Sequence, residues 1–338
     1  MRILWLTQFD YSSDLEAIFA WVMEIRKRKV EVDFFINQLP AYMQRKMQEE
    51  AQKVDNRKFK LFFNINSQQL KNILHYYSYH LLHVHHSSLY PLVSLLSHSI
   101  KIPWIASCFE EIDCRKITHL ENARYLVCTN SFSLNSVEKA LAPFKKNNYQ
   151  LILPAVKSES AMVADKANSD VLYIGGLAAE QEIFFSNLYQ KLKEFDFPGK
   201  IDAVSWHKPS SFRGKIYSWE NIIKLQEIMK NYGTILSYGY YLLQGMAAGK
   251  NALLMENGYG GIICPSAQNN VPDLRYKKKS NWNEDVQEKL KNDILKILKP
   301  SFGKKLRQDC LKYVQENHDP AIAAEKIARL YRFALQNP

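Results

Sequence analysis

Short apolar runs alternate with segments of helical periodicity along most of this 338-residue chain. The first run, Ile3–Thr7, is followed by apolar residues at helical spacing from Leu15 to Ile25, and then by a second run, VEVDFFI. A strand, a helix and a strand in this order are the usual start of a parallel α/β domain. The pattern therefore predicts a doubly wound parallel sheet covered by helices.

The same alternation predicts the other elements of two successive domains. In the first domain, strands are expected at 81–86, 104–107, 125–129 and 150–153, and helices at 41–54 and 135–142. In the second, strands are expected at 171–176, 200–206 and 251–255, and helices at 184–195, 221–232, 284–298 and 302–335, the last with a break near Pro320. The polar stretch Lys157–Asp170 is the expected linker, and the chain length suits two domains with separate cores.

Composition describes a globular protein that is expected to be cytoplasmic. Hydrophobic residues make up 46% of the chain and charged residues 23%, which excludes a disordered or fibrous protein. The five cysteines are an odd number without a paired spacing, as expected in a reducing compartment. The apolar segment MRILWLTQF is followed by Asp10 and Asp14 and is therefore too short for a secretory signal, so none is expected. The uncharged stretches Leu81–Ile100 and Asn231–Gly249 are rich in histidine and serine or in glycine, and are not expected to span a membrane.

A net charge of +11 suits an anionic partner. Candidates are a polyanionic glycan and an anionic membrane face, which would place the protein peripherally at the inner membrane. Basic residues cluster at Arg26–Lys29, Lys145–Lys146 and Lys277–Lys279, and solvated lysines on loops and helix faces explain the same pattern. Nucleic acid is the least favoured partner, because the sequence has no basic stripe interleaved with aromatic residues and no zinc-finger spacing.

The stretch SYGYYLLQGMAAGK, Ser237 to Lys250, has the composition of a turn, a helix of small residues and a glycine stop. A helix that begins near Gly239 points its free backbone N–H groups toward the carboxyl end of the sheet, where they favour a diphosphate. Gly245 allows the helix to pack closely on the sheet, and Gly249 can end it with a positive φ. A plain connection between a helix and a strand is the alternative interpretation.

Several motifs together resemble those of the GT-B glycosyltransferases, specifically the retaining group known as family 4, over most of the chain. In chain order they are MRILWLTQF, IRKRKVEVDFF, HVHHSS, ARYLVCTNS, VLYIGGL, QGMAAGKNALLM and GYGGIICP. The last of these resembles a Gly-rich turn that approaches the donor in the family. The resemblance implies two Rossmann-like domains that face a central cleft. The acceptor-side domain would cover 1–155 and be joined by a C-terminal helix at 320–336, and the donor-side domain would cover 156–318.

The resemblance also implies which residues meet a nucleotide diphosphate sugar, bound as substrate or ligand, and it implies no cofactor and no metal. On the acceptor side these residues are His85 and Phe109, the latter near the position of a family histidine. The donor-binding candidates are Gly175, Gly176, Tyr238, Gly239, Tyr240, Gln244, Asn257, Gly260 and Gly261.

The charged groups of the family's donor site are missing from these motifs. Two glutamates of the family correspond to Leu236 and Gln244, and its arginine and lysine correspond to Gly176 and Gln181. The first loop, QFDYSSD, also lacks the family's Gly-Gly pair.

The absence of charged residues from these segments does not depend on how the motifs are matched to those of the family. Residues 171–190 contain no arginine or lysine, and residues 231–255 contain no aspartate or glutamate. Electrostatic stabilisation is usually the largest catalytic contribution, and removing one such group costs roughly 10²–10³ in rate. The missing charges therefore argue against the family's usual chemistry.

Two other groups of residues have the composition of sites. His80, His83, His85 and His86 invite a metal interpretation, but on a strand His86 would face away from His83 and His85, and a histidine that binds at the strand end is the alternative. Glu110 and Glu111 follow Phe109 and are catalytic candidates, and a solvated acidic loop is their alternative interpretation.

Two functions follow from the motifs and their gaps. In the first, the protein is a catalytically degenerate glycosyltransferase homologue that supports bacterial-type glycan assembly by binding a partner glycosyltransferase, a glycan or a nucleotide. In the second, it is an active retaining hexosyltransferase that moves a sugar from a nucleotide diphosphate sugar to a polysaccharide or lipid-linked acceptor. The residue chemistry favours the first.

Overall fold

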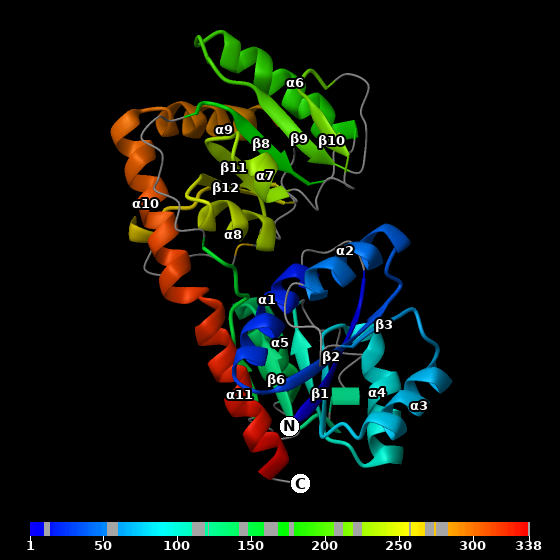
Figure 1. Ribbon diagram of the computed structural model, residues 1–338. Helices are drawn as coiled ribbons and strands as arrows, with labels where there is room; N and C mark the ends of the chain where they lie inside the picture. Colours follow the sequence, from blue (N-terminus) through cyan, green and yellow to red (C-terminus); the bar gives the residue numbers. More distant parts are fainter. Residues whose placement is uncertain are drawn as a thin grey trace. The chain divides into compact units, whose positions relative to one another are not determined.

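The computed structural model describes residues 1–9, 14–52, 60–109, 119–120, 122–141, 148–158, 168–175, 179–205, 212–218, 225–256, 258–267, 274 and 283–336. The chain divides into two compact units (Figure 1). Unit 1 comprises Met1–Ala155 together with Pro320–Pro338, and unit 2 comprises Val156–Asp319.

Unit 1 is built on a seven-stranded sheet in the order β3-β2-β1-β4-β5-β6-β7, and all neighbouring strands are parallel. The strands are β1 Arg2–Gln8, β2 Glu31–Asn37, β3 Leu61–Phe63, β4 Leu81–Val84, β5 Trp104–Cys108, β6 Tyr125–Cys128 and β7 Tyr149–Leu151. The strand order reverses between β1 and β4. In open α/β sheets, ligands bind at the carboxyl ends of the strands beside such a switch point.

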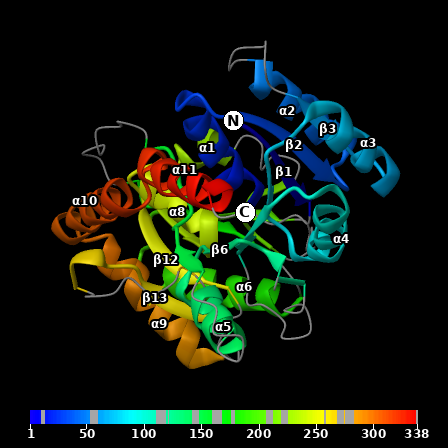
Figure 2. The same cartoon turned by 90° about the horizontal axis from the view of Figure 1, so that it is seen from below.

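Local sequence signals account for several of the helices of unit 1. Asn66 and Gln69 form a capping box at the start of α3, in which each side chain accepts a hydrogen bond from the other residue's backbone N–H. Pro91 lies in the first turn of α4, where its missing N–H costs nothing. The last helix, α11, lies beside α1 (Figures 1 and 2). The described helices are α1 Asp14–Lys27, α2 Ala41–Gln52, α3 Ser67–Tyr77, η1 Ser87–Leu89, α4 Tyr90–Ile100, α5 Ser131–Leu141 and α11 Pro320–Gln336.

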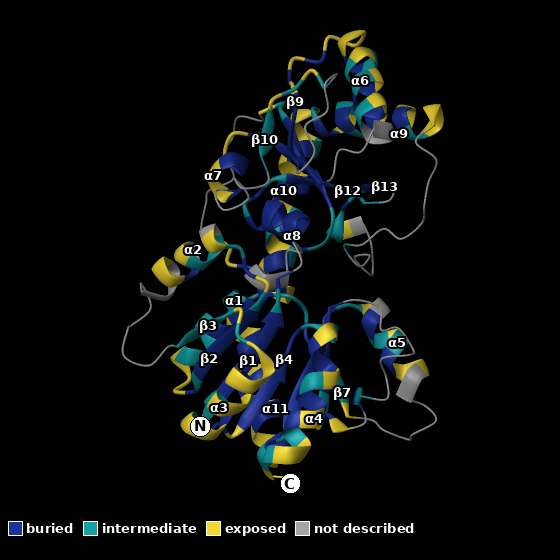
Figure 3. Cartoon of the chain, turned by 90° about the vertical axis from the view of Figure 1, so that its right-hand side faces the viewer, coloured by how far each residue is buried: buried dark blue, intermediate teal, exposed yellow. Residues whose placement is uncertain are grey.

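The core of unit 1 lies along its central strands, which are buried over most of their length (Figure 3). Five consecutive residues are buried in both β1 and β2. Parallel strands that are covered on both faces read as continuous apolar runs, and this explains the composition of VEVDFFI. The indoles of Trp5, Trp21 and Trp104 are fully buried around this sheet.

Unit 2 is built on a six-stranded sheet in the order β10-β9-β8-β11-β12-β13, whose order reverses between β8 and β11. Neighbouring strands are parallel except β13, which is antiparallel to β12. The strands are β8 Val171–Ile174, β9 Ile201–Ser205, β10 Ile216–Ser218, β11 Thr234–Ser237, β12 Asn251–Met255 and β13 Tyr259–Ile262. The described helices are α6 Ala179–Lys193, α7 Leu225–Met229, α8 Gly239–Ala247, η5 Pro265–Ala267, α9 Glu284–Ile297 and α10 Pro300–Asn317.

The two doubly wound α/β domains expected from the sequence are confirmed, and some boundaries are corrected. The strand expected at 81–86 ends at Val84, and the helix expected at 221–232 ends at Met229. Gly260 and Gly261 of GYGGIICP lie in β13 and not in a turn, because the chain already turns before Tyr259, where the Glu256 N–H donates to the Gly258 carbonyl at 3.1 Å. Gly260 is required in that strand for packing, since a Cβ there would lie 2.8 Å from the Leu254 side chain.

A buried aspartate near the start of β2 holds together the amino end of the unit 1 sheet. The Asp33 carboxylate accepts hydrogen bonds from the Tyr79 hydroxyl at 2.7 Å and from the Lys60 backbone N–H at 3.0 Å. It also pairs with the Arg2 guanidinium at 2.6 Å. Tyr79 precedes β4 and Lys60 precedes β3, so one carboxylate links the starts of four strands.

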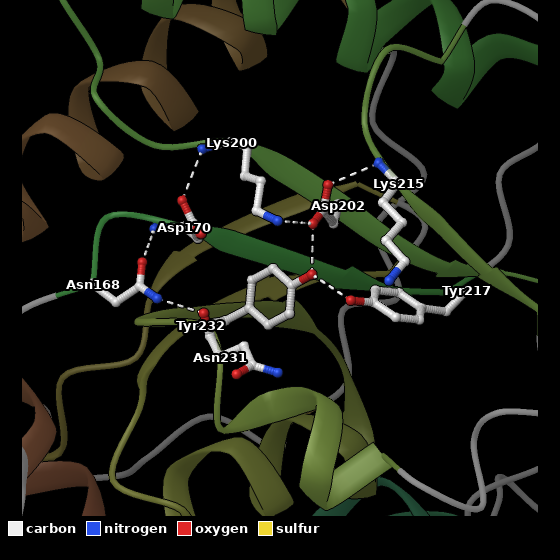
Figure 4. Close-up of polar contacts among 8 residues, drawn as sticks. All are labelled: Asn168, Asp170, Lys200, Asp202, Lys215, Tyr217, Asn231 and Tyr232. Atoms are coloured by element: carbon white, nitrogen blue, oxygen red, sulfur yellow. Dashed lines mark hydrogen bonds and ion pairs between the residues drawn. The ribbon is translucent and has the colours of Figure 1, made fainter.

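Unit 2 repeats this arrangement around Asp202, near the start of β9 (Figure 4). The Asp202 carboxylate accepts from the Tyr232 hydroxyl at 2.6 Å and from the Lys215 backbone N–H at 2.8 Å, and the Lys200 ammonium lies 2.9 Å away. Burial, and then the hydrogen bond to Asp202, raises the pKa of Tyr232. Each of these two aspartate clusters lies at the amino end of its sheet, away from the ligand-binding end, which indicates a structural role.

No helix within the described ranges combines the length and the apolar character needed to cross a membrane.

Candidate functional site

The candidate donor site is at the carboxyl end of the unit 2 sheet, where β8 and β11 lie side by side. Gly175 follows β8, and Tyr238 follows β11. The Ser237 hydroxyl donates to the Ile174 carbonyl at 2.8 Å and ties the two strand ends together. A Cβ on Gly175 would lie 2.6 Å from the Tyr173 hydroxyl oxygen, so any larger residue there would have to displace the Tyr173 side chain. The structure therefore brings Gly175 and Tyr238 to one edge of the sheet.

The N-terminus of α8 begins directly at this edge. Tyr238 is the N-cap residue, and its side chain makes no capping hydrogen bond to the helix. Gly239 has a φ of 55°, a conformation that glycine adopts without strain. The Gly239 N–H donates to the Leu274 carbonyl, so a backbone oxygen already meets the first amide of the helix. The positive end of the helix dipole is present here, but one of its donors is in use.

The close packing that the small residues predict for α8 is present. A Cβ on Gly245 would lie 2.8 Å from Cγ1 of Ile235, so any larger residue would push the helix away from β11. Gly249 has a φ of 65° just after the helix, as expected for a glycine stop.

The side chains around the start of α8 are apolar, aromatic or amide. Leu236 is fully buried and Gln244 is 5% exposed. Tyr240 and Tyr241, in the first turn of α8, are also buried. Burial, and then the neighbouring Tyr238 phenol, raises the pKa of Tyr173, so the Tyr173 phenol stays neutral near pH 7. Described residues 231–255 contribute no carboxylate, and the only basic side chain in that range is Lys250, which donates to the Lys230 carbonyl at 3.2 Å.

The remaining donor candidates are placed apart from this edge or lie outside the described residues. Gly260 and Gly261 are in β13, at the side of the sheet beyond β12. Gly176 and Asn257 lie outside the described residues, and so do the catalytic candidates Glu110 and Glu111.

On the acceptor side, the structure brings His85 and Phe109 together at the carboxyl end of the unit 1 sheet. The ring centroids of His85 and Phe109 are 6.2 Å apart. His85 also lies 4.3 Å from the Trp5 ring, and Phe109 lies 5.6 Å from the Trp21 ring. His85 is 4% exposed, and neither of its ring nitrogens has a hydrogen-bond partner among the described residues. Burial, and then the neighbouring His83, lowers the pKa of His85 well below its usual value.

His83 has a different environment, although its ring is only 4.0 Å from that of His85. Its Nδ1 lies 2.7 Å from the Tyr331 hydroxyl and its Nε2 lies 2.8 Å from the Ser107 hydroxyl. A neutral imidazole has one donor and one acceptor nitrogen, and two hydroxyls satisfy both in either tautomer. Burial lowers the pKa of His83 to about 3. The contact joins α11 to β4 and β5, so His83 has a structural role.

The four histidines do not converge on one point. The His80 Nδ1 accepts from the Arg2 backbone N–H, and the His86 Nδ1 is bonded to the Ser88 hydroxyl. No group of three or more histidine, cysteine, aspartate or glutamate side chains within the described ranges is arranged to hold a metal ion.

Sequence reasoning did not identify the aromatic wall around His85, formed by Trp5 and Trp21, or the contact from Tyr331. The two tryptophans read only as core residues. Tyr331 is 248 positions from His83, and no local pattern predicts a contact at that separation.

Comparison with solved structures finds many glycosyltransferases with this fold. The Anabaena protein HepE, solved in complex with UDP and glucose, matches at 10% identity with a TM-score of 0.69, over 97% of this chain and 98% of that one. A glycosyltransferase from Rickettsia africae matches at 12% identity with a TM-score of 0.70, over 100% and 99% of the two chains. A GtfA/B complex matches at 10% identity with a TM-score of 0.55, over 80% and 61%.

These similarities show the fold. Together with the two parallel sheets, they establish a GT-B architecture of two Rossmann-like domains. No protein-family model matches the chain, and no curated protein matches it in sequence.

Proposed function

We propose that this protein is a glycosyltransferase homologue that no longer transfers sugar and that serves glycan assembly as a binding or partner subunit. The observation that supports this most is the absence of charge beside the start of α8, where described residues 231–255 present no carboxylate and residues 171–190 contain no basic residue. A leaving nucleotide diphosphate develops negative charge that these neutral side chains do not offset.

The environment of Leu236 and Gln244 supports the same proposal. These residues take the places of two family glutamates, and both are buried. Gln244 retains hydrogen-bonding capacity toward a hydroxyl, whereas Leu236 has none. The Gly239 N–H, which a diphosphate would need, already donates to a backbone carbonyl.

His85, the histidine candidate on the acceptor side that the structure describes, is not an accessible base. His85 is enclosed by aromatic rings, and its lowered pKa makes it a poor proton acceptor at neutral pH. The uncharged donor side and the enclosed His85 on the acceptor side are both consistent with a partner enzyme that supplies the catalytic groups. The similar GtfA/B structure is itself a complex of two proteins.

An active retaining transferase is the second candidate function. It is favoured by the position of α8, whose N-terminus lies at the carboxyl end of the sheet where backbone amides bind anions. HepE, which shares the fold, was solved with UDP and with UDP-glucose. In that case Gln244 would contact the donor, and the residues outside the described ranges would supply the charge.

A turnover assay separates the two functions. The purified protein is incubated with UDP- and GDP-sugars, with and without polysaccharide or lipid-linked acceptors, and the released nucleotide is measured. We expect release no faster than in the absence of protein. Release that Gln244→Ala abolishes, and that the exposed control Gln226→Ala leaves unchanged, would establish the active transferase instead.

A further inference from the structure

The helices α1 and α11 form a continuous part of the surface of unit 1. They lie side by side (Figure 2). The Arg28 guanidinium, just beyond the end of α1, donates to the Ala321 carbonyl at the start of α11 at 2.9 Å. The basic end of α1 and the outer face of α11 are therefore adjacent.

Basic charge is concentrated on these two segments. Residues 24–29 and α11 together contain seven basic and two acidic residues, a net charge of +5 out of +11 for the whole chain. Six of the basic side chains are exposed: Lys27, Arg28, Lys29, Lys326, Arg329 and Arg332. Glu24 and Glu325, which pair with Lys27 and Arg329 within their own helices, are already counted in this net charge.

Two bulky apolar side chains are exposed among these charges. Ile322 is 43% exposed and Phe333 is 44% exposed. Ile322, Lys326, Arg329 and Phe333 are spaced by four, three and four residues, which places them on one stripe of the helix. Over the 1.5 Å rise per residue, the stripe is roughly 16 Å long. The opposite face of α11 is buried against unit 1, so the stripe faces outward.

We infer that this surface, the α1–α11 face, docks on a membrane that contains anionic lipids. Basic side chains at a membrane surface are attracted by anionic headgroups, and exposed Ile and Phe side chains between them can enter the boundary with the acyl chains. Lysine and arginine stems cover apolar surface while their charges stay at the headgroups. Ile322 and Phe333 lie at the two ends of this stripe. The exposed isoleucine favours lipid over nucleic acid, because an aliphatic side chain neither binds phosphate nor stacks on a base.

Vesicle sedimentation of the full-length protein tests this docking surface. The probes are vesicles of phosphatidylcholine alone and of equal parts phosphatidylcholine and phosphatidylglycerol. We expect binding to the anionic vesicles only, weakened by added salt. Each basic residue near such a surface contributes about fivefold, so Lys326→Gln, Arg329→Gln and Arg332→Gln together should weaken the partition coefficient on the order of 100-fold.

Two further variants separate lipid docking from general charge attraction. Replacing Lys304, Lys305 and Lys312 on α10 by glutamine removes the same charge elsewhere and should have little effect. Ile322→Ser with Phe333→Ser keeps the charge and should weaken binding at least tenfold, most clearly at high salt, if the apolar side chains enter the bilayer. Circular dichroism of each variant verifies folding.

Several outcomes would overturn the inference. These are an absence of binding to anionic vesicles at low salt, equal loss from the α10 variant, or no effect of the two serine substitutions. Loss of heparin or RNA binding in the α11 variant without any vesicle binding would assign the face to a soluble polyanion. Vesicle binding does not require nucleotide binding or turnover, so its failure is distinct from a failure of the proposed function.

Discussion

Replacing Asp202 by alanine is expected to lower the free energy of unfolding by about 3 kcal/mol. The substitution leaves the Tyr232 hydroxyl and the Lys215 backbone N–H without the acceptor that lies 2.6 and 2.8 Å from them. Asp202 is 1% exposed, so water does not readily replace it. The ion pair with Lys200 adds little to this estimate, because the lysine side chain is 52% exposed.

Because unit 1 has the same arrangement, Asp33→Ala should have an effect of similar size. Urea unfolding monitored by circular dichroism measures both variants. Glu194→Ala removes an exposed carboxylate from unit 2 and should change stability by less than about 0.5 kcal/mol. An Asp202→Ala protein as stable as Glu194→Ala would show that the cluster in Figure 4 does not stabilise the sheet.

Acidification is the second change with a large expected effect. Burial lowers the pKa of His83 to about 3, whereas an unfolded histidine titrates near 6.5. Between these two pH values His83 binds a proton in the unfolded chain but not in the folded chain. The free energy of unfolding therefore falls as the pH drops from about 6.5 toward 3. Between pH 7 and pH 4.5 the protonation of His83 alone should lower the free energy of unfolding by about 2–3 kcal/mol. His85, whose pKa is also lowered, adds a loss of the same sign.

A substitution at His85 separates the destabilisation caused by a buried histidine from that caused by the titration of carboxylates. His85→Phe removes a buried imidazole with no hydrogen-bond partner among the described residues and fits an aromatic environment. Its stability at pH 7 should stay near that of the wild type, and its loss of stability on acidification should be smaller than that of the wild type. His75→Phe, at an exposed position on α3, should retain the wild-type pH profile. Equal pH profiles for the two variants would contradict the structural assignment of His85.

The periodic pattern predicted the strands and helices whose signals are local. β8 and β12 are short and fully buried, and continuous apolar runs predicted both of them. β11 is also short and fully buried, but no strand was predicted there. The small-residue helix α8 and its glycine stop followed from residue size and backbone freedom. α3 was missed although its capping box, Asn66 and Gln69, is a local signal.

Other features depend on contacts that no local pattern contains. β3 is an edge strand of three residues, too short for a recognisable alternation. The buried Asp33 interrupts an apolar run, and only its partners, up to 46 residues away, explain it. The turn expected at Gly260 and Gly261 is a strand, because a Gly-rich segment fits a strand that packs closely on its neighbour as well as it fits a turn.

The central claim, that the donor site has lost its diphosphate-binding charge, is tested most directly by calorimetric titration with UDP, GDP and their common sugar conjugates. A protein that unfolds cooperatively but gives no binding heat with any of these nucleotides is the predicted result. The same titration on Gln244→Ala provides the comparison. Micromolar binding of one nucleotide that Gln244→Ala weakens would contradict the claim and show that the donor site is functional.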